Sequence, residues 1–148
     1  PTTSEVTTYA PEKFPGVRRP ELIVTKEDVR AAIERDEVVL INSLSPADFK
    51  GETNTYARKG HIPTSKNVFF GSHSDEATHL LFDDEVLRKT FDEIGALDTD
   101  KTVITYCGGG IAATWNALLL NKLGQESVAV YDGSMNEWAS DESCPLVV

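Results

Sequence analysis

The sequence predicts an α/β fold in which a single domain is built on a central, mostly parallel five-stranded sheet with helices on both faces. Two observations predict it. Short apolar runs typical of buried strands alternate along the chain with segments that carry helix caps or helical spacing, the pattern of a parallel sheet. The chain also has 148 residues, 40% of them hydrophobic, which is enough for one domain to bury a core.

Residues 1–20 are predicted to form an extended N-terminal arm, and residues 21–148 the folded domain. The arm, PTTSEVTTYAPEKFPGVRRP, contains four prolines and few apolar residues, a composition typical of linkers. It lacks the basic-then-apolar layout of a signal peptide.

The first half of the domain is predicted to contain three strands and two helices. Thr25 begins the first helix, with Asp28 three residues later, as in a capping box. Ser45 is expected to cap a short second helix that has Pro46 in its first position. The three strands are the apolar runs at residues 21–24, 38–42 and 67–70.

The second half is predicted to add two strands and three helices. A helix with acidic residues first ends at Gly95, and another ends at Gly124, because glycine favours the conformation that follows a helix. The strands are expected at residues 102–106 and 127–131, and the helices at 83–95, 112–124 and 134–139.

Charge and composition exclude several classes of function. A formal net charge of −10 disfavours nucleic acid and anionic membranes as partners. No apolar run approaches the roughly 20 residues of a membrane span. The two cysteines and three histidines show no metal-ligand spacing, so we expect no metal and no other cofactor. We expect a cytoplasmic protein.

The stretch VITYCGGGIAATW is the strongest candidate for a functional site. Cys107 ends a predicted strand, and three glycines separate it from a predicted helix. The unpaired N–H groups and the dipole of a helix start favour an anion, and a thiol placed there should ionise more easily than a free one. We therefore predict a catalytic thiolate in an active-site loop formed by Cys107, Gly108, Gly109, Gly110, Ile111 and Ala112.

Three other interpretations fit parts of this stretch. Cys107 could be a small buried apolar residue beside a tight turn. GGGIAA followed by Asp132 matches a dinucleotide-binding pattern, but only 16 residues follow Asp132, too few for the rest of such a fold. A phosphatase loop needs an arginine to bind phosphate oxygens, and Ala113 stands at that position.

Four motifs, in order and spacing, resemble the rhodanese-like domain family, and most closely its thiosulfate and 3-mercaptopyruvate sulfurtransferases. The resemblance runs from about residue 22 to 147. DGS followed by EW is especially characteristic of the sulfurtransferases. The motifs are VVLINSLSPADFKGE, GHIPTSKNV, VITYCGGGIAA and VYDGSMNEWA.

The resemblance implies a sulfurtransferase that works through a persulfide on Cys107. The thiolate would take the outer sulfur of a small donor, such as thiosulfate or mercaptopyruvate, and pass it to a thiol or cyanide. A sulfur-accepting protein is a further possible partner. In this family a six-residue loop, here Cys107 to Ala112, suits sulfur, whereas one more residue suits phosphate or arsenate.

Several positions depart from the family pattern. Asn42 and Leu44 replace the usual Asp-x-Arg, so the arginine that reaches an anionic donor is missing. Gly109 stands where mercaptopyruvate enzymes carry a hydroxyl. Lys50 and Arg58 are the remaining candidates for binding substrate. The alternative function is a rhodanese-like sulfur-carrier or binding module with little turnover of its own.

Overall fold

Five parallel strands form the centre of the structure, a computed structural model that describes residues 2–148. Their order is β1-β5-β4-β2-β3, so β4 is the middle strand. Every neighbouring pair is parallel, which confirms the predicted parallel sheet. The strands are β1 (Ile23–Val24), β2 (Val38–Asn42), β3 (Lys66–Asn67), β4 (Thr102–Tyr106) and β5 (Val128–Tyr131).

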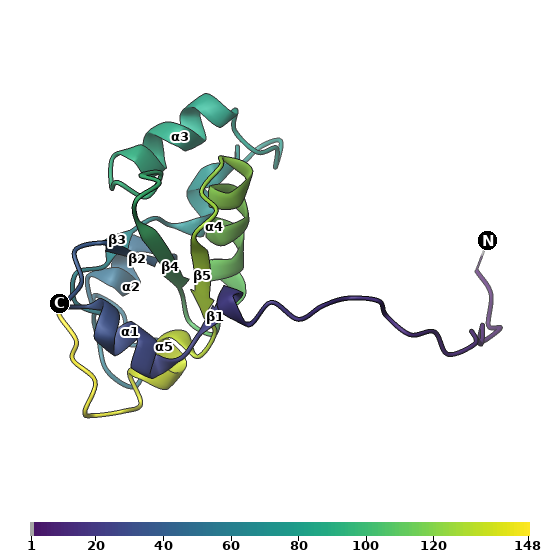
Figure 1. The fold of residues 1–148 in the computed structure, drawn as a ribbon, viewed down its shortest axis with the longest axis horizontal. Coiled ribbons are helices and arrows are strands. Elements are labelled where there is room, and N and C mark those ends of the chain that lie inside the picture. The colour runs from purple at the N-terminus through teal and green to yellow at the C-terminus, as the bar shows by residue number, and fades with distance from the viewer. Residues whose placement is uncertain (1) are drawn as a thin grey trace.

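Helices cover the sheet on both faces, as Figure 1 shows and as the sequence predicts. One face is packed by α1 and α5, and the other by α3 and α4. The helices are α1 (Lys26–Ala32), α2 (Pro46–Phe49), α3 (Asp84–Asp92), α4 (Ile111–Lys122) and α5 (Ser134–Trp138), with 3-10 turns η1 (Pro20–Leu22) and η2 (Phe70–His73).

Strand β2 shows why both faces need a cover. Leu40 points into a buried cluster with Val29 of α1 and Trp138 of α5. Its neighbour Ile41 points the other way, into a cluster with Phe91 of α3 and Leu120 of α4. Successive side chains of a strand face opposite sides, so the apolar run of β2 supplies both halves of the core.

The predicted helix starts are confirmed at α1 and α2. The Thr25 side chain accepts a hydrogen bond from the Asp28 N–H, and the Asp28 carboxylate accepts one from the Thr25 N–H, which completes a capping box. The Ser45 hydroxyl accepts from the Asp48 N–H, with Pro46 in the first turn of α2.

The third strand is shorter than predicted. The sequence predicts a strand at 67–70, whereas β3 covers Lys66–Asn67 and the chain then enters η2. β3 is an edge strand that pairs only with β2, and β2 itself ends at Asn42. The turn η2 instead carries His73 into the interior, where its Nε2 lies 2.7 Å from Oδ1 of Asn116.

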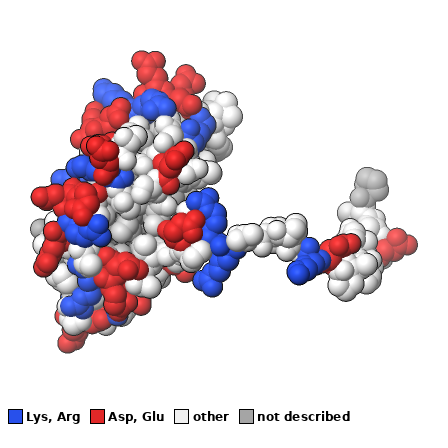
Figure 2. All heavy atoms as spheres, in the orientation of Figure 1, with Lys and Arg blue, Asp and Glu red and all other residues white. Residues whose placement is uncertain are grey.

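Residues 2–19 lie outside the packed body. They contain no helix or strand, and all are exposed. Figure 1 shows them running away from the sheet as an extended chain. Figure 2 shows acidic and basic side chains interspersed over the visible face, with basic ones at the base of the arm, where the sequence has Arg18 and Arg19. Within residues 2–148, no helix has the length and apolar character to cross a membrane.

Candidate functional site

Cys107 lies directly after β4, at the carboxyl end of the middle strand. This is the edge of a parallel sheet at which ligands usually bind. The residue is only 3% exposed and packs with Ala113 and Val130, with Leu44 against the same cluster. Leu44, at the position where the sequence resemblance expects an arginine, therefore packs against the cluster that contains Cys107.

Leu44 is held there by its neighbours in the chain. Oδ1 of Asn42 accepts a 2.9 Å hydrogen bond from the Leu44 N–H. Nδ2 of Asn67, in the adjacent strand β3, donates a 2.9 Å hydrogen bond to the Leu44 carbonyl. The backbone turn after β2 is thus fixed by one hydrogen bond to the Leu44 N–H and one to the Leu44 carbonyl.

Ser134 holds the Cys107 loop. Its Oγ accepts hydrogen bonds from the N–H of Cys107 at 3.0 Å and of Gly110 at 3.2 Å, and it donates one to the Tyr131 carbonyl at 2.8 Å. Ser134 is fully buried and has a φ of 51°, in the left-handed region that non-glycine residues rarely adopt.

The loop is also fastened by its carbonyls. The Cys107 carbonyl accepts from the Met135 N–H at 3.0 Å, and the Gly108 carbonyl from the Asn136 N–H at 2.9 Å. Both donors lie in α5. The start of α5 therefore fixes the position of the loop through main-chain contacts as well as through the Ser134 side chain.

Five amides at the start of α4 have no acceptor among the residues that the structure describes. Because α4 is a helix of 12 residues, this end carries the positive end of its dipole. The sequence predicts that the Gly110 amide is also free to bind an anion, but its N–H donates to Ser134 Oγ. The free amides are those of Gly108, Gly109, Ile111, Ala112 and Ala113.

At each of the three loop glycines, a polar side chain of another segment lies close to where a Cβ atom would be. A Cβ at Gly108 would collide with the Tyr56 hydroxyl. One at Gly109 would lie 3.0 Å from Nδ2 of Asn136. Gly110, whose φ is 82°, lies against the Asp132 carboxylate. The glycines thus leave space that polar groups of other segments fill.

Tyr56 is a site residue that the sequence reasoning missed. Its side chain is half-buried, and burial raises the pKa of its hydroxyl, with further contributions from the negative charges of Asp48 and Cys107. The phenol is therefore protonated at neutral pH. Tyr56 lies in the irregular segment between α2 and β3. This segment has no hydrophobic periodicity, so the sequence gives no sign that Tyr56 contacts a loop that begins 51 positions later.

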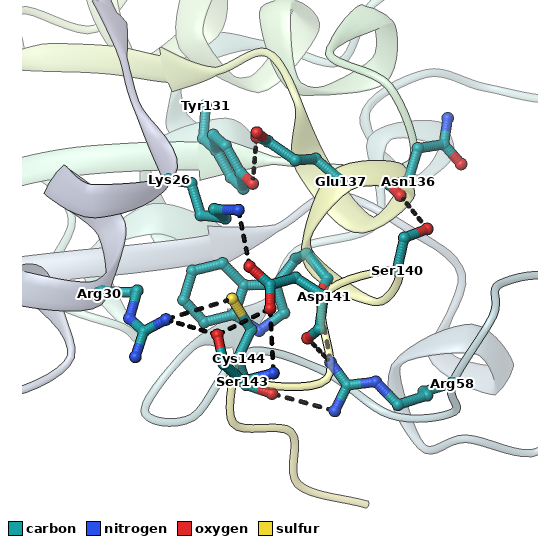
Figure 3. A network of polar contacts seen from close by, with 11 residues as sticks. Lys26, Arg30, Arg58, Tyr131, Asn136, Glu137, Ser140, Asp141, Ser143 and Cys144 are labelled. Carbon is teal, nitrogen blue, oxygen red and sulfur yellow. Dashed lines mark hydrogen bonds and ion pairs between the residues drawn. The ribbon is translucent and has the colours of Figure 1, made fainter.

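Arg58, predicted to bind substrate, has a structural role instead. Four of its five N–H groups donate to main-chain carbonyls at 2.6 to 3.1 Å. Figure 3 shows its guanidinium against the segment that follows α5. Few donors are left for a substrate, which argues against the predicted role of Arg58 in substrate binding. The four carbonyls belong to Trp138, Ala139, Asp141 and Cys144.

Lys50, the other predicted substrate ligand, is exposed at the end of α2. Its backbone N–H donates to the Asp48 and Pro46 carbonyls, which closes the helix. Among the described residues its ammonium group forms no ion pair. Lys50 is therefore available at the surface, and its contact with substrate stays a prediction.

The second cysteine belongs to a different part of the core. Cys144 packs between α1 and α5, and Nη1 of Arg30 donates to its Sγ at 3.9 Å (Figure 3). Burial raises the pKa of its thiol, followed by the charge of Asp141. Cys107 and Cys144 are both free thiols. Within residues 2–148, no cluster of side chains could hold a metal ion.

Comparison with known proteins identifies relatives along nearly the whole chain. A sulfurtransferase of Arabidopsis thaliana, thiosulfate/3-mercaptopyruvate sulfurtransferase 1, mitochondrial, is 34% identical over 94% of this chain and 37% of its own length. A second from that plant is 36% identical over 95% and 41%. Human 3-mercaptopyruvate sulfurtransferase is 30% identical over 93% and 47%. The chain thus spans less than half of each.

Solved structures share the fold. EanB with ergothioneine linked to a persulfide has a TM-score of 0.83 at 23% identity, over 94% of this chain and 35% of that one. A variant of EanB in the cysteine persulfide state with ergothioneine has a TM-score of 0.75 at 26% identity, over 86% and 32%. The ergothioneine biosynthesis enzyme of Chlorobium limicola has a TM-score of 0.75 at 25%, over the same shares.

The family model described as Rhodanese-like domain matches residues 25–141. This range contains all the helices from α1 to α5, the strands β2 to β5 and the Cys107 loop. The chain therefore belongs to the rhodanese-like domain family.

Proposed function

We propose that this chain is a sulfurtransferase that carries the transferred sulfur as a persulfide on Cys107. One observation carries the proposal. A single buried thiol ends the middle strand within a loop whose amides, from Gly108 to the first turn of α4, are largely without an acceptor in the described chain. Such a loop suits a small anion, and a persulfide is one.

The transfer has two steps. The Cys107 thiolate attacks the outer sulfur of the donor; a new S–S bond forms, and the bond from that sulfur to the rest of the donor breaks, with its electron pair leaving on that group. A thiolate or cyanide then attacks the terminal sulfur, and Cys107 leaves as a thiolate again. Dividing one transfer into two steps is nucleophilic catalysis.

The relatives support this chemistry. Several are named as thiosulfate or 3-mercaptopyruvate sulfurtransferases, and a structure of EanB holds a cysteine persulfide. The partners are then a small sulfur donor and a thiol or cyanide acceptor, or a sulfur-accepting protein. The cytoplasmic location stays a prediction, since one relative is named as mitochondrial.

The proposal is tested by the intact mass of the protein after incubation with thiosulfate or mercaptopyruvate. We expect a gain of one sulfur atom that cyanide removes as thiocyanate. Cys107→Ser should abolish the gain, and Cys144→Ser, the matched control, should keep it. Loading on Cys144, or no loading with any donor, would contradict the proposal.

A sulfur-carrier module is the second candidate function. The apolar Leu44 beside Cys107 favours it, because a thiosulfate enzyme needs a cation for its dianionic donor. The same assay separates the two candidates. A carrier would load sulfur and release it only to a partner protein, whereas the enzyme turns over with cyanide or a small thiol.

A further inference from the structure

The Tyr56 hydroxyl stands over the Cys107 loop from outside it. The side-chain space above Gly108, the residue next to the nucleophile, is filled by this hydroxyl. Gly108 follows Cys107 directly in the chain, so the hydroxyl lies in the same site as the thiol. The rest of the Tyr56 side chain packs against the core cluster beneath α1 and α5. The phenol is therefore supported by the fold and directed to the loop.

This hydroxyl has a proton to donate and no partner in the described part of the chain that accepts it. Burial and negative charge act on it, and no hydrogen bond does. Nearby, the Asp48 carboxylate is occupied by three hydroxyls at 2.6 to 2.8 Å and leaves Tyr56 unbonded. An unpaired donor beside a nucleophile is available to a substrate. The three hydroxyls are those of Ser45, Thr53 and Thr55.

The two donor classes need different help when they lose sulfur. A thiosulfate-type donor releases sulfite, a stable anion. A mercapto keto acid releases a carbon group, so that the electron pair of the broken C–S bond spreads onto the keto oxygen as an enolate. A preorganised O–H directed to that oxygen stabilises the charge as it develops. The loop itself offers no side-chain hydroxyl next to Cys107, because glycines follow it.

We propose that Tyr56 is a catalytic residue that donates a hydrogen bond to the enolate oxygen of a mercapto keto acid, which makes such acids the preferred donors. The proposal rests on the persulfide function and names its substrate class. Cys107 gains the sulfur, the C–S bond breaks, Tyr56 keeps its proton while it stabilises the enolate, and water then protonates the carbon to give the keto acid.

The test compares Tyr56→Phe with the unaltered protein using two donors. We time sulfur loading of Cys107 by intact mass with mercaptopyruvate, and with thiosulfate or, where thiosulfate loads too slowly to time, inorganic polysulfide. We expect Tyr56→Phe to slow loading from mercaptopyruvate about 100-fold, the usual cost of one such donor, and loading from the other donor less than about 3-fold. Tyr9→Phe, which alters an exposed phenol of the arm, is the matched control and should change neither rate.

Equal losses with both donors would overturn the proposal, because a merely structural role of Tyr56 affects every donor alike. Unchanged loading from mercaptopyruvate would overturn it as well. These outcomes differ from a failure of the persulfide function, in which the unaltered protein takes up no sulfur from either donor.

Gly108→Ala approaches the same contact from the loop. Its Cβ would displace the Tyr56 hydroxyl, whereas the ring carbons lie 3.3 Å away and need to give only slightly. We expect a selective loss with mercaptopyruvate in the unaltered background and a much smaller additional loss in Tyr56→Phe, because the two changes remove one interaction. Fully multiplicative losses would overturn the proposal.

Discussion

Two regions that contact α5 differ in which main-chain groups need a hydrogen-bond partner. The Cys107 loop exposes amide donors, and the segment after α5 exposes carbonyl acceptors. One side chain binds each set. A residue with a strained backbone binds amides of the loop, and a residue distant in sequence binds the carbonyls. Ser134 accepts hydrogen bonds from two amides of the loop. Arg58 donates to four carbonyls, one at the end of α5 and three in the segment after it. Figure 3 shows its guanidinium against this segment.

The difference lies in what is left over. Arg58 uses four of its five N–H donors to bind four carbonyls, so these carbonyls already have a hydrogen-bond partner. Ser134 binds only two amides and leaves five others without an acceptor in the described chain. Arg58 thus stabilises the fold, whereas at the Cys107 loop the partial positive charge comes from main-chain amides at the start of α4.

Arg58→Ala should give the largest effect. We expect the free energy of unfolding to fall by about 3 kcal/mol, because a hydrogen bond from a charged donor contributes about 1.5–3 kcal/mol and some freed carbonyls regain water. Chemical denaturation measures this. Sulfur loading of the folded variant should stay within about 2-fold of the unaltered protein.

A matched control is Arg35→Ala, which breaks an exposed ion pair with Glu37 and should cost less than about 1 kcal/mol. Normal stability of Arg58→Ala combined with a large loss of sulfur loading would restore the role in substrate binding that the sequence predicts.

Ser134→Ala tests the other region and should lower the free energy of unfolding by about 2 kcal/mol, because two buried amides lose their acceptor. Ser134→Gly loses the same acceptor but relieves the positive φ, so it should be about 1 kcal/mol more stable than Ser134→Ala. Sulfur loading should slow in both. A Ser134→Ala protein as stable as the unaltered one would show that Ser134 does not hold the loop.

The smallest expected effect concerns His73, which supports α4 from behind the loop through Asn116. Burial lowers the pKa of His73. Its neutral form is therefore favoured by folding, and this contribution is complete above the unfolded pKa of about 6.5. It is lost as the pH falls from there through the folded pKa, since the unfolded chain binds a proton that the folded one excludes.

Free energies of unfolding across this pH range should fall less steeply for His73→Gln than for the unaltered protein. His79→Gln, which alters an exposed histidine, should keep the original slope. Equal slopes for His73→Gln and the unaltered protein would contradict the buried, neutral assignment.

Local signals were sufficient for several elements, although the first strand, predicted at 21–24, is only Ile23–Val24 because a 3-10 turn occupies Pro20–Leu22. The bounds of β2 and β4, the caps at Thr25 and Ser45, and the position of Cys107 after its strand all follow from patterns within a few residues. Hydrophobic alternation and capping depend on neighbours in sequence, which is why such patterns predict them. The family could be identified from four motifs for the same reason.

The sequence by itself determined the parallel sheet, the place of Cys107 after its middle strand and the glycine loop that follows it. Only the tertiary structure decided which side chains surround that loop, because Tyr56, Arg58 and Ser134 reach their partners across packed elements. A charged residue near a motif looks the same in sequence whether it binds substrate or main-chain carbonyls, and Arg58 does the latter. The length of β3 was decided in the same way, by where its only neighbouring strand ends.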